Sequence, residues 1–302
     1  MTCLVYHRVD NLHNNSFLTR GGSPVIPPDA FAKEMLFFIK IGAKFFTFKQ
    51  LMEGKFPKPD ECGFIISFDD CFLDNYTNGL EVLERLGIKA VFFQTTALVD
   101  AKDLLWEHAI YWHMRDEKHT GEFKELAYRI FQMDPKAKNF APREFINHLI
   151  SKLSLSQIEV LLNEAKNYFH TEQELRALAK RIYPNAGHLR EAHALGHEIG
   201  SHGHRHLWRP WMDGRAFEDE LDTSSRTLEH ILKEKPLSFS YPFNGYIEAD
   251  EQLCAKYFSY VATVNCGRID ECSNRRSLPR FSWPGFTNNP LKQRRWLLTG
   301  TF

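Results

Sequence analysis

Short apolar runs recur along this chain of 302 residues, and helical patterns separate them. The runs are apolar at consecutive rather than alternate positions, which is typical of parallel strands buried on both faces. The predicted strands are 3–6, 64–68, 90–93, 197–200, 237–241 and 260–264, and the helical patterns between them include 28–41, 74–86 and 214–233. The alternation of strand and helix predicts an α/β fold, either a barrel or a wound parallel sheet.

One long segment interrupts this alternation. From residue 101 to residue 190 the sequence carries amphipathic helical patterns and no convincing strand pattern. The helices predicted in it are 103–114, 121–131, 142–153 and 155–169. Because the segment lies between two core strands, we expect a single domain over 1–302 with a helical insertion at 101–190. The insertion is either a surface decoration that adds stability or a lid that shapes a substrate cleft.

The charge balance argues against a polyanionic partner. Lys plus Arg and Asp plus Glu number 38 each, so no overall field draws the chain to nucleic acid or to an acidic membrane. No apolar run approaches the roughly 20 residues of a membrane span, and residues 1–8 show no basic leader followed by an apolar segment. We therefore expect no nucleic-acid partner, no transmembrane segment and a cytoplasmic location. The oligomeric state is left open.

Two adjacent carboxylates follow one of the predicted strands. Asp69 and Asp70 come directly after 64–68, at the strand end where parallel α/β folds build their active sites. Two carboxylates this close repel each other, so either a bound cation or a raised pKa on one of them would relieve the repulsion. A helix N-cap beside a solvated acid would explain the pair equally well.

A second predicted strand end is rich in imidazole. His202 and His206 flank His204 just after the strand predicted at 197–200. Their spacing lets both outer imidazoles bind one ion from a turn or a first helical turn. A single histidine is more often a structural group than a ligand, but three at alternate positions favour metal binding. Carboxylates at one strand end and imidazoles at another suggest one metal site.

Taken together, three segments resemble the polysaccharide deacetylase family, also called the NodB-homology or carbohydrate esterase 4 group. The family's first motif, Ser/Thr-Phe-Asp-Asp-Gly, stands at 67–71 as Ser-Phe-Asp-Asp-Cys. Its second, His-Ser/Thr-x-x-His, stands at 202–206 as His-Gly-His-Arg-His, and its Tyr-Pro-Phe/Tyr-Gly turn stands at 241–245 as Tyr-Pro-Phe-Asn-Gly. Tyr-His-Arg-Val at 6–9 and Leu-Pro-Arg-Phe at 278–281 add support.

This resemblance covers about 1–100 and 190–284, and it implies a distorted (β/α)7 barrel of the NodB type. It also implies roles: Asp70, His202 and His206 would bind a divalent metal, usually Zn²⁺, and Asp69 would be the general base. Two neutral imidazoles and one carboxylate leave coordination positions open for water and a substrate oxygen, and they also suit Co²⁺, Ni²⁺ or Fe²⁺. The backbone N–H of Tyr241 would help to hold the oxyanion.

The implied activity is that of a hydrolase of linear amides. The chain would remove an N-acetyl group from an N-acetylated sugar or glycan during the assembly of a surface polysaccharide or glycoconjugate. Two alternatives remain open. One is an amidase that acts on a small non-sugar amide, and the other is a catalytically weak sugar-binding pseudoenzyme.

Several positions depart from the family pattern. Cys71 replaces a Gly, Gly203 replaces a Ser or Thr, and Asn244 adds to or substitutes within the third motif. Cys71 is either a small buried hydrophobe or a reactive thiol beside the metal ligand. The six cysteines form no CxxC pair, so we expect reduced, mostly structural thiols.

No residue is clearly assigned as the general acid, because the family's C-terminal Leu-x-x-His is absent and no His follows His230. His7, at the end of the first predicted strand, and His204 are the available imidazoles. His7 is the better candidate, although a structural role for it is equally open. Arg280 could pair with Asp69 and keep that carboxyl ionised.

Other side chains could bind the substrate or a partner. The aromatic candidates for stacking on sugar rings are Trp106, Tyr111, Trp112 and Trp283, for which core packing is the alternative. The segment 292–298 is basic and amphipathic, which is compatible with a solvated terminal helix or with a surface contact.

Overall fold

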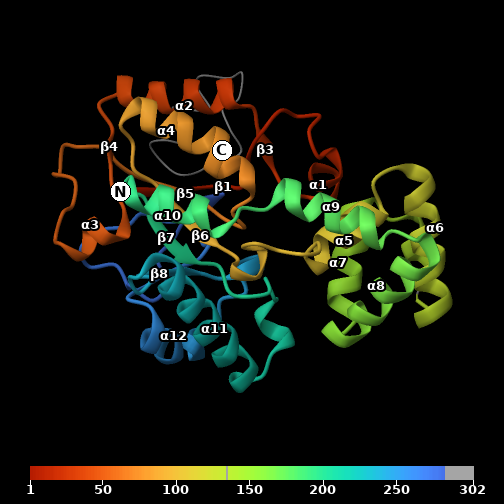
Figure 1. The fold of residues 1–302 in the computed structure, drawn as a ribbon. Helices are drawn as coiled ribbons and strands as arrows, with labels where there is room; N and C mark the ends of the chain where they lie inside the picture. Colours follow the sequence, from red (N-terminus) through yellow and green to blue (C-terminus); the bar gives the residue numbers. More distant parts are fainter. Residues whose placement is uncertain (134, 283–302) are drawn as a thin grey trace.

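A curled parallel sheet forms the centre of the fold (Figure 1). The computed structural model describes residues 1–133 and 135–282. Seven strands follow one another in the order β10-β1-β5-β6-β7-β8-β9, β4 pairs with the start of β5, and β2 and β3 form a separate pair. The strands are β1 (Thr2–Tyr6), β2 (Arg8–Val9), β3 (Val25–Ile26), β4 (Lys44–Phe45), β5 (Gly63–Phe68), β6 (Val91–Gln94), β7 (Glu198–Ser201), β8 (Ser238–Ser240), β9 (Tyr260–Ala262) and β10 (Phe281–Ser282). The expected α/β class is confirmed.

The two ends of the sheet approach each other. Ala262, at the end of β9, forms a parallel bridge with Leu278. The chain then enters β10, where Phe281 pairs with Leu4 of β1 at the opposite end of the strand order. The sheet is therefore strongly curled, in agreement with the distorted barrel expected from the sequence.

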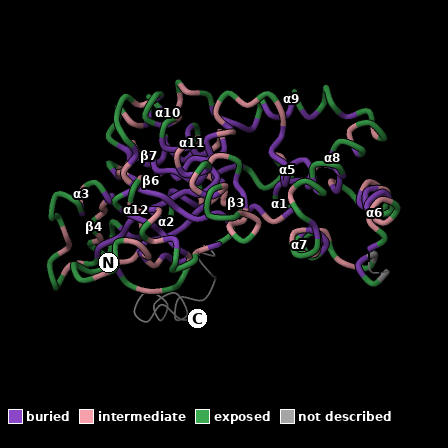
Figure 2. Tube along the Cα trace, turned by 90° about the horizontal axis from the view of Figure 1, so that it is seen from below, coloured by how far each residue is buried: buried purple, intermediate pink, exposed green. Residues whose placement is uncertain are grey.

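The two faces of β5 have different surroundings. Phe64, Ile66 and Phe68 belong to one apolar cluster, whereas Ile65 belongs to another, which also holds Val91 and Phe93. Figure 2 shows buried chain running through β6 and β7. Side chains two positions apart share a face of a strand, so the register that buries Ile65 also directs residues 67 and 69 to its side. The β5 register thus delivers the first carboxylate of the pair to the inside of the curl.

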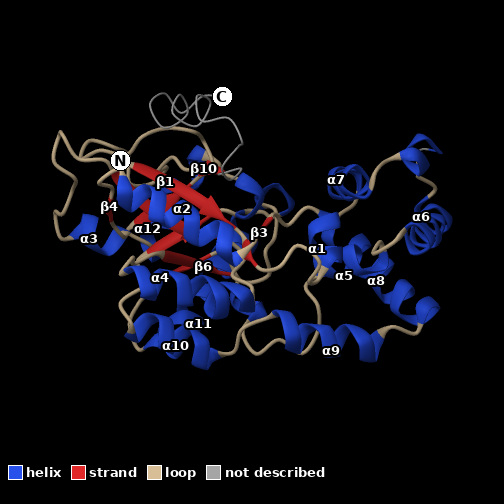
Figure 3. Cartoon of the chain, turned by 90° about the horizontal axis from the view of Figure 1, so that it is seen from above, coloured by secondary structure: helices blue, strands red, loops and turns tan. Residues whose placement is uncertain are grey.

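Helices cover the outside of the sheet (Figures 1 and 3). They are α2 (Pro28–Lys40), α3 (Phe48–Met52), α4 (Leu80–Leu86), α10 (Ala186–Ala194), α11 (Gly214–Leu232) and α12 (Glu251–Tyr257). The pattern at 74–86 predicted one regular helix, but the structure has a π-helical turn, η1 (Asn75–Gly79), before α4. In this turn Asn75 and Asn78 donate hydrogen bonds to the carbonyl oxygens of His7 and Val9. The wider turn therefore ties α4 to the end of β1.

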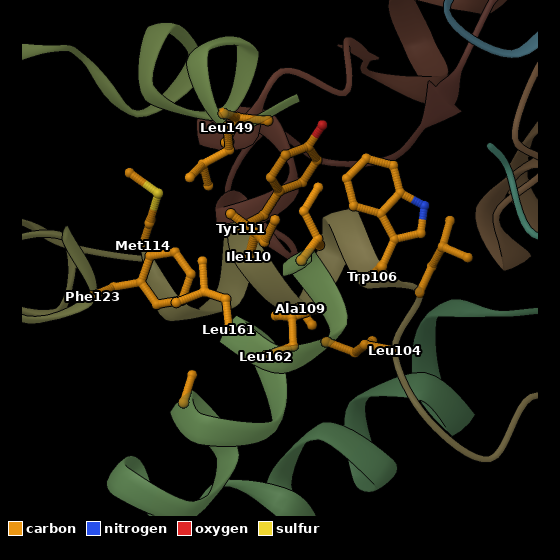
Figure 4. Close-up of a cluster of buried hydrophobic side chains, with 14 of the residues drawn as sticks. Leu104, Trp106, Ala109, Ile110, Tyr111, Met114, Phe123, Leu149, Leu161 and Leu162 are labelled. Carbon is orange, nitrogen blue, oxygen red and sulfur yellow. The ribbon is translucent and has the colours of Figure 1, made fainter. Parts of the chain in front are cut away.

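Five further helices lie together to one side of the sheet (Figures 1 and 3). They are α5 (Trp106–His113), α6 (Glu117–Phe131), α7 (Pro142–Lys152), α8 (Leu155–Phe169) and α9 (Glu172–Ile182). Their inward faces share an apolar cluster, part of which Figure 4 shows, and Phe17 and Leu18 of α1 (Ser16–Gly21) join it. In contrast, Leu189 and Ala192 of α10 belong to a cluster of the sheet and its helices. The division into one domain and an insertion stays a prediction.

The remaining helical pieces are short turns: η2 (Thr96–Leu98), η3 (Pro135–Asn139), η4 (Arg209–Trp211), η5 (Pro242–Asn244) and η6 (Glu248–Asp250). Among the described residues, no helix has the length and apolar character to cross a membrane. Trp283 and the segment 292–298, both named above as candidate contact sites, lie outside the described residues.

Candidate metal and catalytic centre

Three buried side chains converge where β5 and β7 end. Asp70 follows β5, and His202 and His206 follow β7. Their ligand atoms all lie within 4.8 Å of one another. The Nε2 atoms of His202 and His206 are 3.5 and 3.1 Å from the same oxygen, Oδ1 of Asp70. The structure thus brings together the three residues predicted as metal ligands.

A hydrogen bond at His202 and an ion-pair contact at His206 hold both imidazoles in a ligand-like orientation. Nδ1 of His202 is 2.7 Å from the carbonyl oxygen of Ser240, and because a carbonyl only accepts, Nδ1 carries the proton. In the neutral ring this leaves the lone pair on Nε2, which faces Asp70. Nδ1 of His206 lies 2.6 Å from Oε1 of Glu107. Two Nε2 atoms, each on a ring with a partner at Nδ1, and one carboxylate fit a divalent ion such as Zn²⁺.

The ionisation of this group follows from its paired charges. Burial by itself would lower the pKa of His206, but the carboxylates of Glu107 and Asp70 outweigh burial and raise this pKa to about 10. Burial would also raise the pKa of Asp70, yet the neighbouring His206 and His202 hold it well below its usual value. Glu107 and Asp70 thus place negative charge on both sides of the His206 ring, and this negative charge also favours a bound cation.

The other member of the carboxylate pair has a separate partner. Arg280 donates to both oxygens of Asp69, at 2.7 and 2.8 Å, and both side chains are buried. The hydroxyl of Ser240 adds a longer contact of 3.4 Å. Burial would raise the pKa of Asp69, but the Arg280 guanidinium outweighs it and holds this pKa below its usual value. Asp69 is thus an ionised and firmly oriented carboxylate at neutral pH.

The loops that present these groups contain backbone in the left-handed region. Non-glycine residues with positive φ are Asp70 (61°), Cys71 (57°), His206 (53°), Phe243 (54°) and Asn244 (52°). Such conformations cost an L-residue about 1–2 kcal/mol, and they are concentrated where the surroundings impose them. β5 ends at Phe68, and the backbone turns at Asp70, whose carboxylate lies beside the two histidines.

A carboxylate from α11 holds the backbone of the histidine loop, residues 202–206. Oε2 of Glu220, on α11, accepts hydrogen bonds from the backbone N–H groups of His204 and Arg205 at 3.0 and 2.8 Å. Gly203, which stands where the family has Ser or Thr, has a φ of 76°, a conformation that glycine adopts without strain. Glu220 therefore fixes the backbone of this loop between the two candidate ligands.

A cavity of about 380 Å³ opens at this group and is lined from two sides. The barrel side contributes the predicted site residues His7, Asp69, Asp70, His202, His206 and Tyr241. Further lining comes from α5 and α7 and includes Glu107, Tyr111, Arg143, Ile146, Asn147 and Ile150. A bound molecule would therefore touch both the barrel and the helices of the 101–190 segment.

The two candidate general acids, His7 and His204, differ in whether they line the cavity. His7 lines the cavity and lies close enough to Asp69 and Asp70 to favour their ionised forms. The ring of His204 instead contacts the hydroxyl of Thr96 at 2.9 Å, and it does not line the cavity. The N–H of Tyr241 lies 3.5 Å from the carbonyl oxygen of Ala262, which is at the long end of hydrogen bonding.

The aromatic candidates mostly serve packing. Trp106 is buried against Trp211 and Phe243, and Trp112 packs edge-on against Phe17. Of the three candidates that the structure describes, Tyr111 is the one that lines the cavity.

The thiol beside the metal ligands should be inert in the folded protein. Cys71 is fully buried, and burial, reinforced by the charge of Asp69, raises the pKa of its thiol well above the usual value. Cys3 and Cys254 are also buried, whereas Cys62, Cys266 and Cys272 are exposed. We expect a disulfide reagent to label the three exposed cysteines rapidly in the native protein and all six after denaturation, with the sites identified by mass spectrometry. Labelling of Cys71 in the native protein at the rate of Cys62 would contradict this assignment.

Three supporting residues of the site were not among the candidates predicted from the sequence. Glu107 contacts His206, Glu220 holds the histidine loop, and Ser240 contacts both His202 and the Asp69–Arg280 pair. Ser240 lies one position before the third motif, so its place next to that motif could have indicated a position in the site. Glu107 and Glu220 lie on helices, where a carboxylate is ordinary, and no spacing connects them to the histidines.

Comparisons with known proteins relate part of the sequence and the whole fold to a known family. The family model described as polysaccharide deacetylase matches residues 163–257, which include the second and third motifs but not Asp69 and Asp70. Among solved structures, the fold is similar to Streptococcus pyogenes deacetylase PplD in complex with acetate, with 14% identity, a TM-score of 0.60 and coverage of 94% of this chain and 92% of that one.

Two further structures show the same similarity. IcaB from Ammonifex degensii has 15% identity and a TM-score of 0.60, with coverage of 98% of this chain and 95% of that one. The deacetylase domain of BpsB from Bordetella bronchiseptica has 14% identity and a TM-score of 0.57, with coverage of 93% and 95%. No curated protein sequence matches the chain significantly. At these identities the structural comparisons establish the fold.

Proposed function

We propose that this chain is a metal-dependent N-deacetylase of an N-acetylated sugar or glycan. The chain is related to the polysaccharide deacetylase family, by fold over most of its length and by sequence over residues 163–257. The predicted enzyme class is confirmed at the level of the family, whose members act on N-acetyl amide bonds. A role in surface polysaccharide or glycoconjugate biosynthesis belongs to the same proposal.

One observation carries the proposal. The ligand group Asp70, His202 and His206 lies in the same cavity as Asp69, an ionised carboxylate held by Arg280. A cation site beside a base is one arrangement that can hydrolyse an unactivated amide. Zn²⁺ is the proposed ion, because two imidazoles and one carboxylate are a common ligand set for catalytic zinc, although Co²⁺, Ni²⁺ and Fe²⁺ suit these ligands too.

Asp70, His202 and His206 would hold the ion. When bound, a divalent ion supplies Lewis acidity, which lowers the pKa of water and polarises a substrate carbonyl. Asp69 would accept a proton from the water that attacks the acetamide carbon. Arg280 keeps Asp69 ionised and fixes its direction, because both of its terminal nitrogens are engaged with that carboxylate.

Attack on the carbonyl carbon places negative charge on its oxygen. The N–H of Tyr241 would donate to that oxygen, and a donor of this kind typically contributes about 3 kcal/mol to the stability of the transition state. Its 3.5 Å contact with Ala262 is weak enough to exchange for a stronger one. The nitrogen of the amide must then take up a proton before the carbon–nitrogen bond breaks, which yields acetate and a free amine.

His7 is the proposed donor of that proton. It lines the cavity beside Asp69 and Asp70, and Asn75 of η1 holds its backbone carbonyl at 2.8 Å. His204, the alternative considered from the sequence, faces Thr96 instead. A general acid contributes about 10²- to 10⁴-fold to such a reaction.

The helices of the 101–190 segment would contribute to substrate binding. Tyr111 of α5 and Arg143 and Asn147 of α7 line the same cavity as the candidate metal ligands, so they could contact a sugar ring and its substituents. We therefore propose that the segment shapes the substrate cleft, as a lid or as a fixed wall. A cytoplasmic location stays a prediction.

The experiment that tests this function measures acetate release from N-acetylglucosamine oligomers and from a panel of small free amides. We expect release from the N-acetylated sugars that chelation abolishes and added Zn²⁺ restores. Acetate release that survives both chelation and His202→Ala would overturn the proposal.

The same assay separates the two alternatives. Faster hydrolysis of a small amide than of any N-acetylated sugar would identify a non-sugar amidase. Stoichiometric metal with tight glycan binding but no turnover would identify a pseudoenzyme.

A further inference from the structure

The first turn of α5 contacts His206 at two points. The indole N–H of Trp106 donates to the backbone carbonyl oxygen of His206 at 3.3 Å, across 100 positions of sequence. The next residue, Glu107, places Oε1 2.6 Å from the Nδ1 of the same histidine. We propose that this turn is a positioning element of the metal centre, in which Glu107 orients the imidazole of His206 toward the ion. The inference rests on the proposed metal dependence and assigns a role that none of the three motifs contains.

The surroundings of His206 make Glu107 difficult to replace. Nδ1 of His206 is buried, and among the residues that the structure describes no group meets hydrogen-bond geometry with it. The contact with Glu107 is itself short rather than well aligned, so it is an ion-pair contact. A carboxylate behind a metal-bound imidazole selects the tautomer, limits rotation of the ring and increases the basicity of the ligand nitrogen. His202 receives the corresponding support from the uncharged carbonyl of Ser240.

The backbone of His206 also requires external support. Its φ of 53° is in the left-handed region, which a non-glycine residue occupies only when its surroundings impose it. The Trp106 hydrogen bond holds the carbonyl side of the residue, and the ring of Phe243 lies against the imidazole with centroids 4.6 Å apart. Trp106 contacts that Phe243 ring as well, at 5.9 Å. Backbone and ring are therefore both held by a surface to which α5 contributes.

The helix that makes these contacts is itself firmly anchored. Figure 4 shows Ala109 and Ile110 of α5 in an apolar cluster with Leu161 and Leu162 of α8. Ala109 and Ile110 are almost fully buried, and Glu107 is only 3% exposed. A ligand-positioning group works best on a rigid element, because small displacements of a ligand weaken metal binding. Packing within the α5–α9 group is thereby connected to the geometry at the metal.

The test measures metal affinity directly rather than activity. Glu107→Gln keeps the shape and one acceptor oxygen but removes the charge, and Glu107→Ala removes the contact. We expect Zn²⁺ to bind about 10-fold more weakly to the Gln variant and about 100-fold more weakly to the Ala variant, the range typical of such supporting groups. A chromophoric chelator in competition gives the dissociation constants. With Co²⁺ the visible absorption spectrum should shift in both variants, because the imidazole changes its direction.

The matched control is Glu122→Gln, on α6 in the same segment. Glu122 makes a surface contact of 4.0 Å with Lys118, so its replacement should leave Zn²⁺ affinity and the Co²⁺ spectrum unchanged. Circular dichroism of every variant checks that it is folded, and the isosteric Gln variant keeps the test decisive if the Ala variant is not.

The outcomes distinguish this inference from the proposed function. Wild-type affinity in folded Glu107→Gln and Glu107→Ala would overturn the positioning role and leave deacetylation untouched. A wild-type protein that binds Zn²⁺ but releases no acetate would overturn the function, whereas weaker binding in the Glu107 variants would still support the positioning role. A wild-type protein that binds no Zn²⁺ would overturn both.

Discussion

His202→Ala is expected to lower kcat/KM on an N-acetylated sugar by about 1000-fold and to lose stoichiometric metal. The variant removes an Nε2 that lies 3.5 Å from Oδ1 of Asp70, within the proposed ligand group. Loss of Lewis-acid assistance costs several kcal/mol of transition-state stabilisation, and each 1.4 kcal/mol corresponds to a factor of ten. Metal content by elemental analysis and acetate release in the same preparation provide the two measurements.

His204→Ala is the matched control for this experiment. The two histidines belong to the same loop, but the ring of His204 contacts Thr96 and does not line the cavity. We expect the control to retain its metal and to stay within a few-fold of wild-type activity. Equal losses in the two variants would mean that the loop, rather than the ligand, was responsible.

Arg280→Met is expected to destabilise the fold by about 3–5 kcal/mol at neutral pH, because it leaves the buried carboxylate of Asp69 without its counterion. Asp69→Asn in the same chain should recover part of the loss, since no buried charge then remains unpaired. A surface counterpart, Arg176→Met, breaks an exposed pair with Glu172 and should cost at most about 0.5 kcal/mol. Urea unfolding gives all three values.

The pH dependence of Arg280→Met has a definite sign. In the wild type the pKa of Asp69 is below its ordinary value, so the pair stabilises the fold above that ordinary value, about 3.9, and the contribution is lost as the pH falls through the folded-state pKa. Without Arg280, burial raises the pKa of Asp69. The variant should therefore be closer to the wild type in stability at pH 5 than at pH 7, and the acid limb of its pH–rate profile should move to higher pH. A constant difference across this range would show that Asp69 is not the group responsible.

The strands and the ligand group were predictable because their signals are local. Continuous apolar runs predicted β1, β5, β6 and β7 within a residue or two, and the spacing of His202 and His206 indicated a shared ion. Helix boundaries were less certain where a cap competed with a poor helix former. The pattern at 121–131 placed the helix start at Gly121, but α6 begins at Glu117, because the side chain of Asp116 accepts the N–H of His119 and caps the helix there.

The parts that could not be predicted depend on distant segments meeting. Whether His7 or His204 faces the cavity depends on how the loops fold, and the sequence ranked His7 only slightly higher. The contact of Glu107 with His206 requires a helix of the α5–α9 group to pack against a loop at the end of β7. No sequence periodicity relates residues 107 and 206, so a single sequence cannot predict that they are in contact. The π-helical turn at 75–79 likewise results from hydrogen bonds to carbonyls of the β1–β2 region.

The pairing of Asp69 with Arg280 also has a consequence for how the protein is made. The two residues are 211 positions apart, and Arg280 lies immediately before β10, the last described strand. On a ribosome that releases the N-terminus first, β1 and β5 emerge long before the guanidinium that neutralises Asp69. Until then, closing the curled sheet around this carboxylate is unfavourable, so a nascent chain should keep that end of the sheet open. Asp69, the proposed base, would become competent when β10 docks, so we expect assembly of this site to be a late event in folding.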